Sequence, residues 1–174
     1  MAKKLATTLC VLVLACSAAM AAVDRNLPNF GVVAPGLYRG AAPTDAGLAK
    51  LKQMGVKTIV DLRIAPHTVK AEAAEARKMG FQFVNLPMGA EPPTKKQVAT
   101  FLALAGGAPA SPIYVHCQHG ADRTGTMVGI YRETHDHWTF ERAYAEMRHY
   151  GFNRRWTKLR AAVQERAPDL SAQR

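Results

Sequence analysis

The chain has 174 residues, of which 48% are hydrophobic and 21% are charged, and its formal net charge is +10. A composition this apolar excludes an intrinsically disordered chain, and three cysteines are too few for a disulfide scaffold. The length fits one globular domain. The positive charge favours anionic partners without choosing among nucleic acid, lipid headgroups, anionic sugars and phosphorylated substrates.

Residues 1–21 have the pattern of a secretory signal peptide. Two lysines precede a short apolar run, and Ala19, Met20 and Ala21 supply a small-residue cleavage site. We therefore expect an exported protein, either periplasmic or secreted. Cys16 offers an alternative, because the residues before it resemble the lipobox of bacterial lipoproteins, in which this cysteine is lipidated and anchors the chain to a membrane.

The rest of the chain divides into an extended lead-in over 22–35, one folded domain over 36–167 and a short tail over 168–174. Cleavage after Ala21 leaves Cys117 as the only cysteine. Because an exported chain with one cysteine has no internal disulfide, that thiol is either a buried bystander or a reactive group.

Strands and helices alternate along the folded domain. The apolar patterns predict strands at 37–39, 56–62, 81–86 and 113–116, and helices at 43–54, 68–78, 94–105, 124–134, 140–150 and 153–165. Thr94 and Gln97 form a capping box at the start of the third helix. The alternation predicts an α/β fold with a mostly parallel central sheet and helices on both faces, followed by helices only.

One apolar stripe on the last helix predicts core positions. Trp156, Leu159 and Val163 recur there at helical spacing, so we expect all three side chains to be buried. Asp61 and Arg63 stand at the end of a predicted strand, and we expect them to support the neighbouring loop rather than to react.

The segment 115–125 reads Val-His-Cys-Gln-His-Gly-Ala-Asp-Arg-Thr-Gly and joins a predicted strand to a predicted helix. A loop of this kind points several backbone N–H groups at an anion, and the helix dipole adds positive potential. Arg123 offers a planar fork for two oxygens of a phosphate or sulfate. The same positive environment favours the thiolate form of Cys117, which would face the bound phosphate as a nucleophile.

This strand, HCxxGxxR[ST]G loop and helix resemble the cysteine-based protein tyrosine and dual-specificity phosphatases. The matching positions are His116, Cys117, Gly120, Arg123, Thr124 and Gly125. The late position of the loop, with only helices after it, is similar to the dual-specificity class. The approximate resemblance covers 36–166, and its specific part is the loop. It implies a phosphatase-like fold and the hydrolysis of phosphoric monoesters, with no cofactor.

The resemblance also implies a role for each loop residue. Cys117 attacks phosphorus to give a phosphocysteine, and Arg123 clamps the phosphate oxygens. Thr124 donates a hydrogen bond to the leaving thiolate, while His116 orients the loop and helps to keep the cysteine deprotonated. The phosphate oxygens are bound by the loop positions Gln118, His119, Gly120, Ala121, Asp122 and Arg123.

The identity of the general acid departs from the family pattern. The acid is usually an Asp on an upstream loop, but the corresponding loop, 87–93, contains no Asp and Glu91 is its only acid. Asp122 is the second candidate, because the DRTG ending resembles myotubularin-like and some bacterial phosphoinositide and tyrosine phosphatases. We favour Asp122 slightly over Glu91. The alternatives are a backbone cap for Asp122 and a solvated loop charge for Glu91.

A metal site is the first competing interpretation of the motif. His116, His119, His135 and His137 lie near one another in the sequence, but they lack the two paired ligand clusters of a structural zinc site. We therefore predict no metal.

Two other function classes are alternatives to a phosphatase. A rhodanese-like sulfurtransferase also uses a cysteine in an anion-binding loop, but its loop is usually one residue shorter and lacks the Arg-Thr-Gly ending. A non-catalytic phosphate-binding module would not need the thiol of Cys117.

No nucleic-acid partner is expected, because no aromatic-basic platform or recognition helix is present. The expected partner is a phosphorylated protein or a small anionic phosphate ester, with phosphoinositides, inositol phosphates and phosphorylated polysaccharides open. A membrane is expected only if Cys16 is lipidated.

Overall fold

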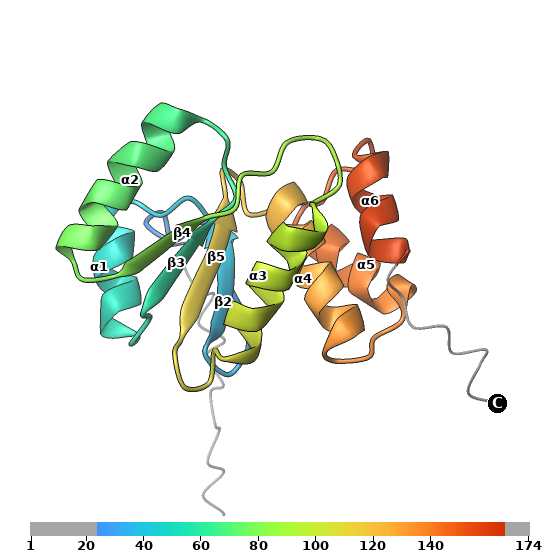
Figure 1. Ribbon diagram of the computed structural model, residues 1–174, viewed down its shortest axis with the longest axis horizontal. Helices are drawn as coiled ribbons and strands as arrows, with labels where there is room; N and C mark the ends of the chain where they lie inside the picture. Colours follow the sequence, from blue (N-terminus) through green and yellow to red (C-terminus); the bar gives the residue numbers. More distant parts are fainter. Residues whose placement is uncertain (1–23, 166–174) are drawn as a thin grey trace, which may run out of the picture.

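A five-stranded β-sheet passes through the centre of the computed structural model, which describes residues 24–165 (Figure 1). The strands are β1 (Gly31–Ala34), β2 (Leu37–Ala41), β3 (Thr58–Asp61), β4 (Gln82–Asn85) and β5 (Ile113–Cys117). Their order is β1-β2-β5-β3-β4, and every neighbouring pair is parallel except β1 with β2. The predicted mostly parallel sheet is thus confirmed. The predicted signal peptide over 1–21, with Cys16, and the predicted tail at 168–174 lie outside the described residues.

Helices cover both faces of this sheet, as predicted. The helices are α1 (Asp45–Gln53), α2 (Pro66–Lys78), α3 (Lys95–Gly106), α4 (Asp122–Thr134), α5 (Phe140–His149) and α6 (Thr157–Gln164). In Figure 1, α1 and α2 lie on one side of the strands, and α3 to α6 lie on the other. Side chains alternate along each strand, so Ile59 and Tyr114 pack into the core under α1, while Val60 and Val115 pack into the larger core under α3 to α6.

The predicted capping box begins α3, and one of its residues also holds the preceding loop over 87–94. Thr94 Oγ1 accepts a hydrogen bond from the Gln97 N–H at 3.2 Å, and Gln97 Oε1 accepts one from the Thr94 N–H at 2.7 Å. Gln97 Nε2 also donates to the carbonyl of Pro87 at 2.6 Å. The start of α3 therefore holds the beginning of the loop over 87–94.

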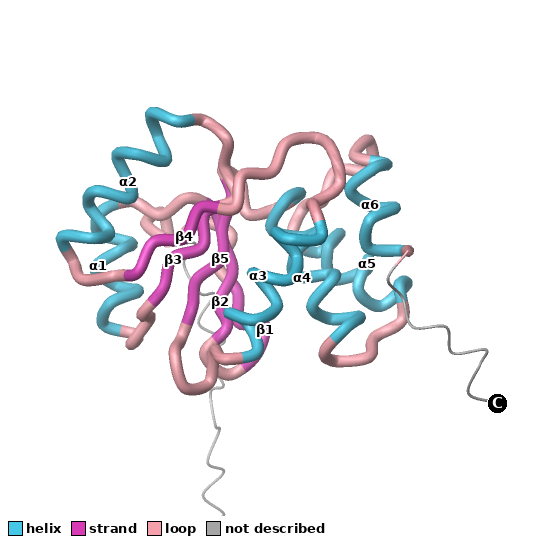
Figure 2. The backbone as a smooth tube through the Cα atoms, in the orientation of Figure 1, coloured by secondary structure: helices cyan, strands magenta, loops and turns pink. Residues whose placement is uncertain are grey.

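The lead-in over 22–35 contains a strand that the sequence analysis did not predict. β1 lies beside β2 at the edge of the sheet (Figure 2). It has only four residues, with Val33 buried and Val32 59% exposed. So short a run gives too little alternation to be recognised as a strand from its sequence.

The last helix begins later than predicted, and this changes the position of one aromatic residue. α6 starts at Thr157 rather than at 153. Leu159 and Val163 are buried as predicted, but the prediction for Trp156 was wrong, since its side chain is 39% exposed. Trp156 precedes the first helical residue, so it does not continue the apolar stripe inward.

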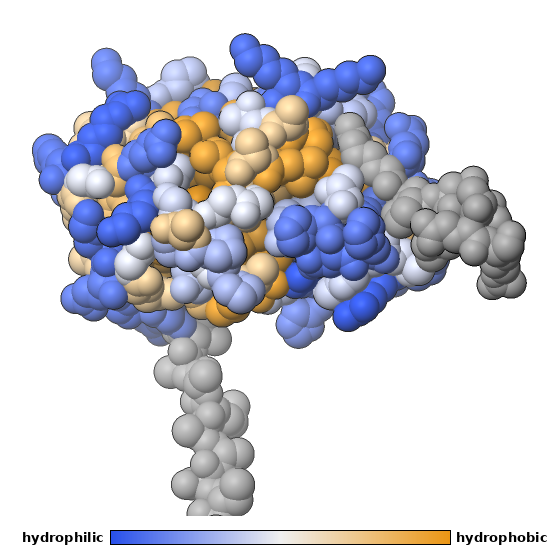
Figure 3. All heavy atoms as spheres, turned by 60° about the horizontal axis from the view of Figure 1, so that its bottom comes forward, coloured by the Kyte–Doolittle hydropathy of each residue, from blue (hydrophilic) through white to orange (hydrophobic). Residues whose placement is uncertain are grey.

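Hydrophilic side chains surround an apolar area on the face shown in Figure 3. The exposed large hydrophobic residues in the described part of the chain are Val32, Met54, Ile64 and Trp156. Among residues 24–165, no helix combines the length and the apolar character needed to cross a bilayer.

Candidate active site

The motif loop leaves the central strand of the sheet and enters α4. Cys117 is the last residue of β5 and is 2% exposed, and α4 begins at Asp122. Because β2, β3 and β4 run parallel to β5, the segments that follow these strands gather at the same edge. Ligands of open α/β sheets bind at this carboxyl edge.

Side chains from distant parts of the sequence hold the carbonyl groups on the outer side of the loop. Asn29 Nδ2 donates to the carbonyl of His119 at 3.0 Å. Arg39 Nη2 donates to the carbonyl of Gly120, also at 3.0 Å. Among the described residues, the N–H groups of residues 118–123 have no acceptor. These N–H groups, together with the N-terminus of α4, are therefore available to an anion.

Gly120 allows the loop to pass close to β2. Its φ angle is +68°, and a Cβ atom placed there would lie 2.4 Å from the carbonyl carbon of Gly40. Both the backbone conformation and the close approach require glycine at this position.

A cavity of about 480 Å³ opens over the loop. Its lining residues are Arg63, Ile64, Ala65, Met88, Gly89, Ala90, Gln118, His119, Asp122, Arg123, Trp156 and Leu159. Arg123 is half-buried, and its nearest hydrogen-bond acceptor is the carbonyl of Met88 at 3.5 Å. No carboxylate pairs with Arg123 in the described part of the chain. Its guanidinium is thus free to bind an oxyanion in the cavity.

The two candidate acids occupy different positions. Asp122 lines the cavity, and its Oδ1 accepts a hydrogen bond from the Asn153 N–H at 2.8 Å. The side chain of Glu91 is 70% exposed, lies outside the cavity lining and pairs with Lys158 Nζ at 2.5 Å. Asp122 therefore has one carboxylate oxygen engaged in a backbone cap and the other available, while Glu91 has the environment of a solvated loop charge.

The remaining motif residues divide between the cavity and the buried side of the loop. Gln118 and His119 are exposed and line the cavity, whereas Ala121 is buried at the start of α4. The Thr124 hydroxyl is fully buried and has no hydrogen-bond partner among the described residues. A buried hydroxyl without a hydrogen-bond partner costs stability, so the Thr124 O–H is a donor that the described residues leave unused.

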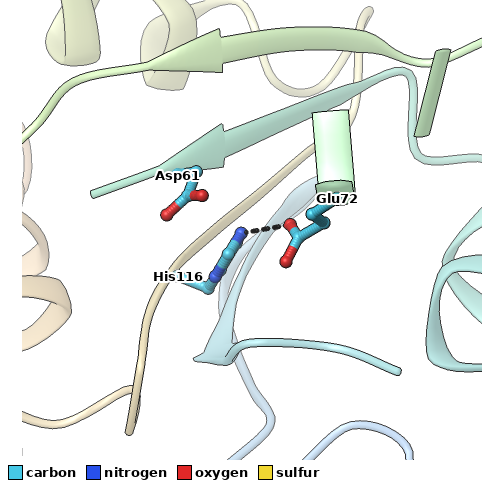
Figure 4. A group of neighbouring side chains, drawn as sticks. All are labelled: Asp61, Glu72 and His116. Carbon is cyan, nitrogen blue, oxygen red and sulfur yellow. Dashed lines mark ion pairs between the residues drawn. The ribbon is translucent and has the colours of Figure 1, made fainter. Parts of the chain in front are cut away.

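Figure 4 shows three side chains of a buried ionic cluster, Asp61, Glu72 and His116, the last of which directly precedes Cys117 in the sequence. Arg63 donates to both oxygens of Asp61 at 2.8–3.1 Å and to Glu72 Oε2 at 2.6 Å. His116 Nε2 lies 2.8 Å from Glu72 Oε1. Burial acts to lower the pKa of Arg63, but its hydrogen bonds to Asp61 and the charge of Glu72 outweigh this and raise it. Asp61 and Arg63, for which we expected a structural role, thus form an ion pair with each other.

The same cluster has the composition of a metal site, because ligand atoms of Asp61, Glu72 and His116 lie within 4.8 Å of one another. The guanidinium of Arg63 already binds both carboxylates, however. A divalent cation would have to share them with a positive charge in direct contact, so the donor set fits an ion-pair network better than a metal.

Sequence analysis did not identify Asn29, Arg39 or Glu72. Arg39 had a signal that could have revealed it, since a charged residue in the middle of an apolar strand needs a buried partner. Glu72 lies in a helix rich in Ala and Glu, where nothing distinguishes it from its exposed neighbours.

Comparison with known proteins places this arrangement in a family. Residues 25–165 match the model of a family described as "DSP-PTPase phosphatase fused to NAD+ Kinase". The dual specificity protein phosphatase TpbA of Pseudomonas aeruginosa is 30% identical over 132 residues, which are 75% of this chain and 58% of that protein. The chain thus spans less than two thirds of this relative.

Two further similarities bear on fold and substrate. A crystal structure of P. aeruginosa TpbA, a cysteine-to-serine variant in complex with phosphotyrosine, is 27% identical to this chain. It superposes with a TM-score of 0.67 over 78% of this chain and 83% of that chain. A protein of Arabidopsis thaliana named inositol diphosphatase DSP3 is 28% identical over 109 residues, which are 60% of this chain and 54% of that protein.

Proposed function

The chain belongs to the family of cysteine-based DSP-PTPase phosphatases, and we propose that it is a phosphomonoesterase that acts through a phosphocysteine on Cys117. One observation carries the proposal. Cys117 is buried at the end of the central strand, directly before a loop whose N–H groups have no acceptor among the described residues, and the guanidinium of Arg123 lines the cavity over that loop. Loss of aryl phosphate turnover in Cys117→Ser, with the fold retained, is the first test. A folded wild-type chain without turnover would instead indicate a phosphate-binding module.

The reaction has two displacements. The Cys117 thiolate attacks phosphorus, and the bond from phosphorus to the ester oxygen breaks with its electron pair going to that oxygen, which takes a proton from the Asp122 carboxyl. Water then attacks the phosphocysteine and gives a proton to Asp122, while the S–P electron pair returns to sulfur. Arg123 and the loop N–H groups stabilise the phosphoryl oxygens in both steps. Thr124 supplies a hydrogen bond to the departing thiolate.

Asp122 is the better candidate for the acid, because it lines the cavity and Glu91 does not. We expect Asp122→Asn to lower kcat on a phosphotyrosine peptide by about 10²-fold or more, since the leaving oxygen needs a proton. On an aryl phosphate whose leaving group is stable as an anion, the same variant should lose little. Asn retains the acceptor for the Asn153 N–H, so the cap is preserved.

Glu91→Gln is the matched control and should leave turnover of both substrates unchanged. The reverse pattern, a leaving-group-dependent loss in Glu91→Gln and none in Asp122→Asn, would assign the acid to the loop over 87–94.

Phosphotyrosine in proteins is the substrate class that the cavity favours. Ile64 and Trp156 are exposed apolar residues in its lining, and they offer contact surface to an aromatic ring. Of the two arginines that line the cavity, Arg63 is engaged by carboxylates, which leaves Arg123 for a single phosphate. The phosphotyrosine complex of a relative gives the same indication.

Inositol phosphates are the second candidate, favoured by the similarity to a protein named inositol diphosphatase and by the net positive charge. Trp156→Ala separates the two classes. It should raise KM for a phosphotyrosine peptide and leave KM for a non-aromatic phosphate ester unchanged. A higher kcat/KM of the wild type on inositol phosphates than on the peptide would reverse the assignment.

Export rests on the sequence of residues 1–21. We expect the protein in the periplasmic or secreted fraction with Ala22 as its first residue. Recovery in the membrane fraction with a lipidated Cys16 would support the lipoprotein alternative, and a cytoplasmic protein that retains Met1 would contradict both.

A further inference from the structure

Asn29 connects two segments of the chain with one side chain. Its Nδ2 donates to the carbonyl of His119, in the loop after Cys117, and to the carbonyl of Tyr150, directly after α5. Both donor–acceptor distances are 3.0 Å, and the two acceptors lie 90 and 121 positions from Asn29 in the sequence. A side-chain NH₂ group has two N–H donors, so both are used. Asn29 therefore ties the loop to the C-terminal end of α5.

Both ends of this connection are held in place. The carbonyl of Pro28 accepts a hydrogen bond from the N–H of Ala41 at 2.8 Å, which fixes the chain just before Asn29 to the end of β2. The φ angle of Asn29 is +53°, a left-handed conformation that Asn adopts more readily than most residues. The ring of Tyr150 lies 3.8 Å from the guanidinium of Arg39, which is itself fully buried. The amide of Asn29 is thus supported on both sides and can hold the loop.

The hydrogen bond to His119 also orients the next N–H of the loop. Because the described part of the chain contains no cis peptide bond, the carbonyl of His119 and the N–H of Gly120 point in opposite directions. Asn29 holds this carbonyl on the outer side of the loop, so the N–H of Gly120 points to the inner side. That N–H has no acceptor among the described residues, which leaves it available to an anion.

We propose that Asn29 is a positioning residue that aims the N–H of Gly120 at a phosphate bound by the loop. The carbonyl of Tyr150 is the fixed point against which the side chain holds the loop. The inference rests on the proposed function of this loop as a phosphate site. It also makes the segment before β1, for which the sequence predicted only an extended lead-in, part of the active site.

The direct test is a titration of the full chain with inorganic phosphate, followed by NMR at the backbone amides. In the wild type, the amide proton of Gly120 should shift as phosphate binds. Asn29→Gly removes both donors, and glycine adopts a positive φ angle without strain, so this variant isolates the loss of the side chain. Its dissociation constant for phosphate should rise about tenfold, and the shift of Gly120 at saturation should be smaller.

Two further variants separate the lost donors from other effects of the substitution. His137 is the other non-glycine residue with a positive φ angle in the described part of the chain, at +54°, and it is exposed. His137→Gly is therefore the matched control and should leave phosphate affinity and turnover unchanged. Asn29→Asp keeps the shape of the side chain, but a carboxylate only accepts hydrogen bonds. Its phosphate affinity should fall at least as far as that of Asn29→Gly.

Turnover measures the same effect during the reaction. Asn29→Gly should lower kcat about tenfold on an aryl phosphate and on a phosphotyrosine peptide alike, because the N–H of Gly120 acts on phosphoryl oxygens that both substrates share. Removing an oxyanion donor outright costs roughly 10²–10³ in kcat, and here the donor is misdirected rather than absent. A loss confined to the peptide would contradict the proposal.

The outcomes separate this inference from the proposed function. An active enzyme in which the wild type, Asn29→Gly and Asn29→Asp bind phosphate equally would overturn the positioning role alone. A wild type without turnover, whose Gly120 amide responds to phosphate and whose affinity drops in Asn29→Gly, would contradict the phosphatase and leave the positioning role established. If neither variant folds by circular dichroism, the wild-type titration still decides, because a Gly120 amide that does not respond to bound phosphate would overturn the inference.

Discussion

Arg39 is buried in the core and donates a hydrogen bond to the loop that follows Cys117. Its side chain is fully buried, its Nη2 holds the carbonyl of Gly120, and its guanidinium lies 3.8 Å from the centre of the Tyr150 ring. Burial lowers the pKa of Arg39 to about 10, so it remains charged at neutral pH. Its Nε and Nη1 have no hydrogen-bond partner among the described residues. A cation satisfied this poorly costs stability, and we infer that it is retained for the loop.

Arg39→Met should therefore separate stability from activity. Because the substitution removes an incompletely paired buried charge, the free energy of unfolding should change by no more than about 1 kcal/mol. The carbonyl of Gly120 loses its donor, so kcat/KM on an aryl phosphate should fall at least about tenfold, equivalent to roughly 1.4 kcal/mol. Denaturant titration and steady-state kinetics measure the two effects.

Arg25→Met is the control for loss of an exposed arginine and should change neither quantity. Full activity in Arg39→Met would show that the loop keeps its shape without this donor.

At the scale of single residues, the motif could be predicted because its functional residues lie close together in the sequence. Cys117 and Arg123 are six positions apart, and each residue type has a reason to be there. Asn29 and Arg39 reach the loop from about 80–90 positions away, as their hydrogen bonds to His119 and Gly120 show. The sequence marks Arg39 as a charge that needs a buried partner, but it does not identify the partner of Arg39 or of Asn29, because contacts over this separation depend on how β1 and β2 are placed beside β5.

At the scale of elements, one arginine joins α4 to α5. Arg132 on α4 binds both oxygens of Glu146 on α5, at 3.0 and 2.7 Å, and Asp136 at 2.7 Å. Burial acts to raise the pKa of Asp136, but hydrogen bonds from Arg132 and His135 outweigh this and lower the pKa below 3.8. Asp136 therefore stabilises the folded state when it is ionised.

The contribution of Asp136 should depend on pH in a definite direction. Since its pKa is lower in the folded chain than the ordinary 3.8, its stabilisation is fully present above about pH 4 and is lost as the pH falls through the lower folded value. Asp136→Asn should cost about 1 kcal/mol of unfolding free energy near neutral pH and progressively less on acidification. Urea titrations of both proteins across this range provide the measurement. A cost that is the same at every pH would show that charge is not its origin.

Helices and central strands were predictable where their patterns were long. The capping box of Thr94 and Gln97 marked the start of α3 correctly, and β3, β4 and β5 lie within a residue or two of their predicted positions. The edge strand β1 and the start of α6 were not predictable. Each depends on tertiary contacts, β1 on pairing with β2 and α6 on the turn that leaves Trp156 at the cavity.

At the scale of the whole molecule, the parallel sheet brings scattered polar groups to one edge. The loop of Cys117, the segment of Arg63 after β3 and the loop after β4 meet there, and α6 supplies the opposite wall of the cavity. The sheet could be predicted from the alternation of strands and helices, whereas the cavity needed the loops to be placed in space. Its apolar wall includes Ile64 and Trp156.

We expect Cys117 to carry the phosphoryl group during turnover, and the decisive experiment is to trap that intermediate. The full chain is mixed with an aryl phosphate, quenched in acid during turnover, digested and examined by mass spectrometry. We predict a phosphorylated peptide that contains Cys117, absent from Cys117→Ser. Steady turnover by Cys117→Ser, or a phosphoryl group on any other residue of the wild type, would contradict the account.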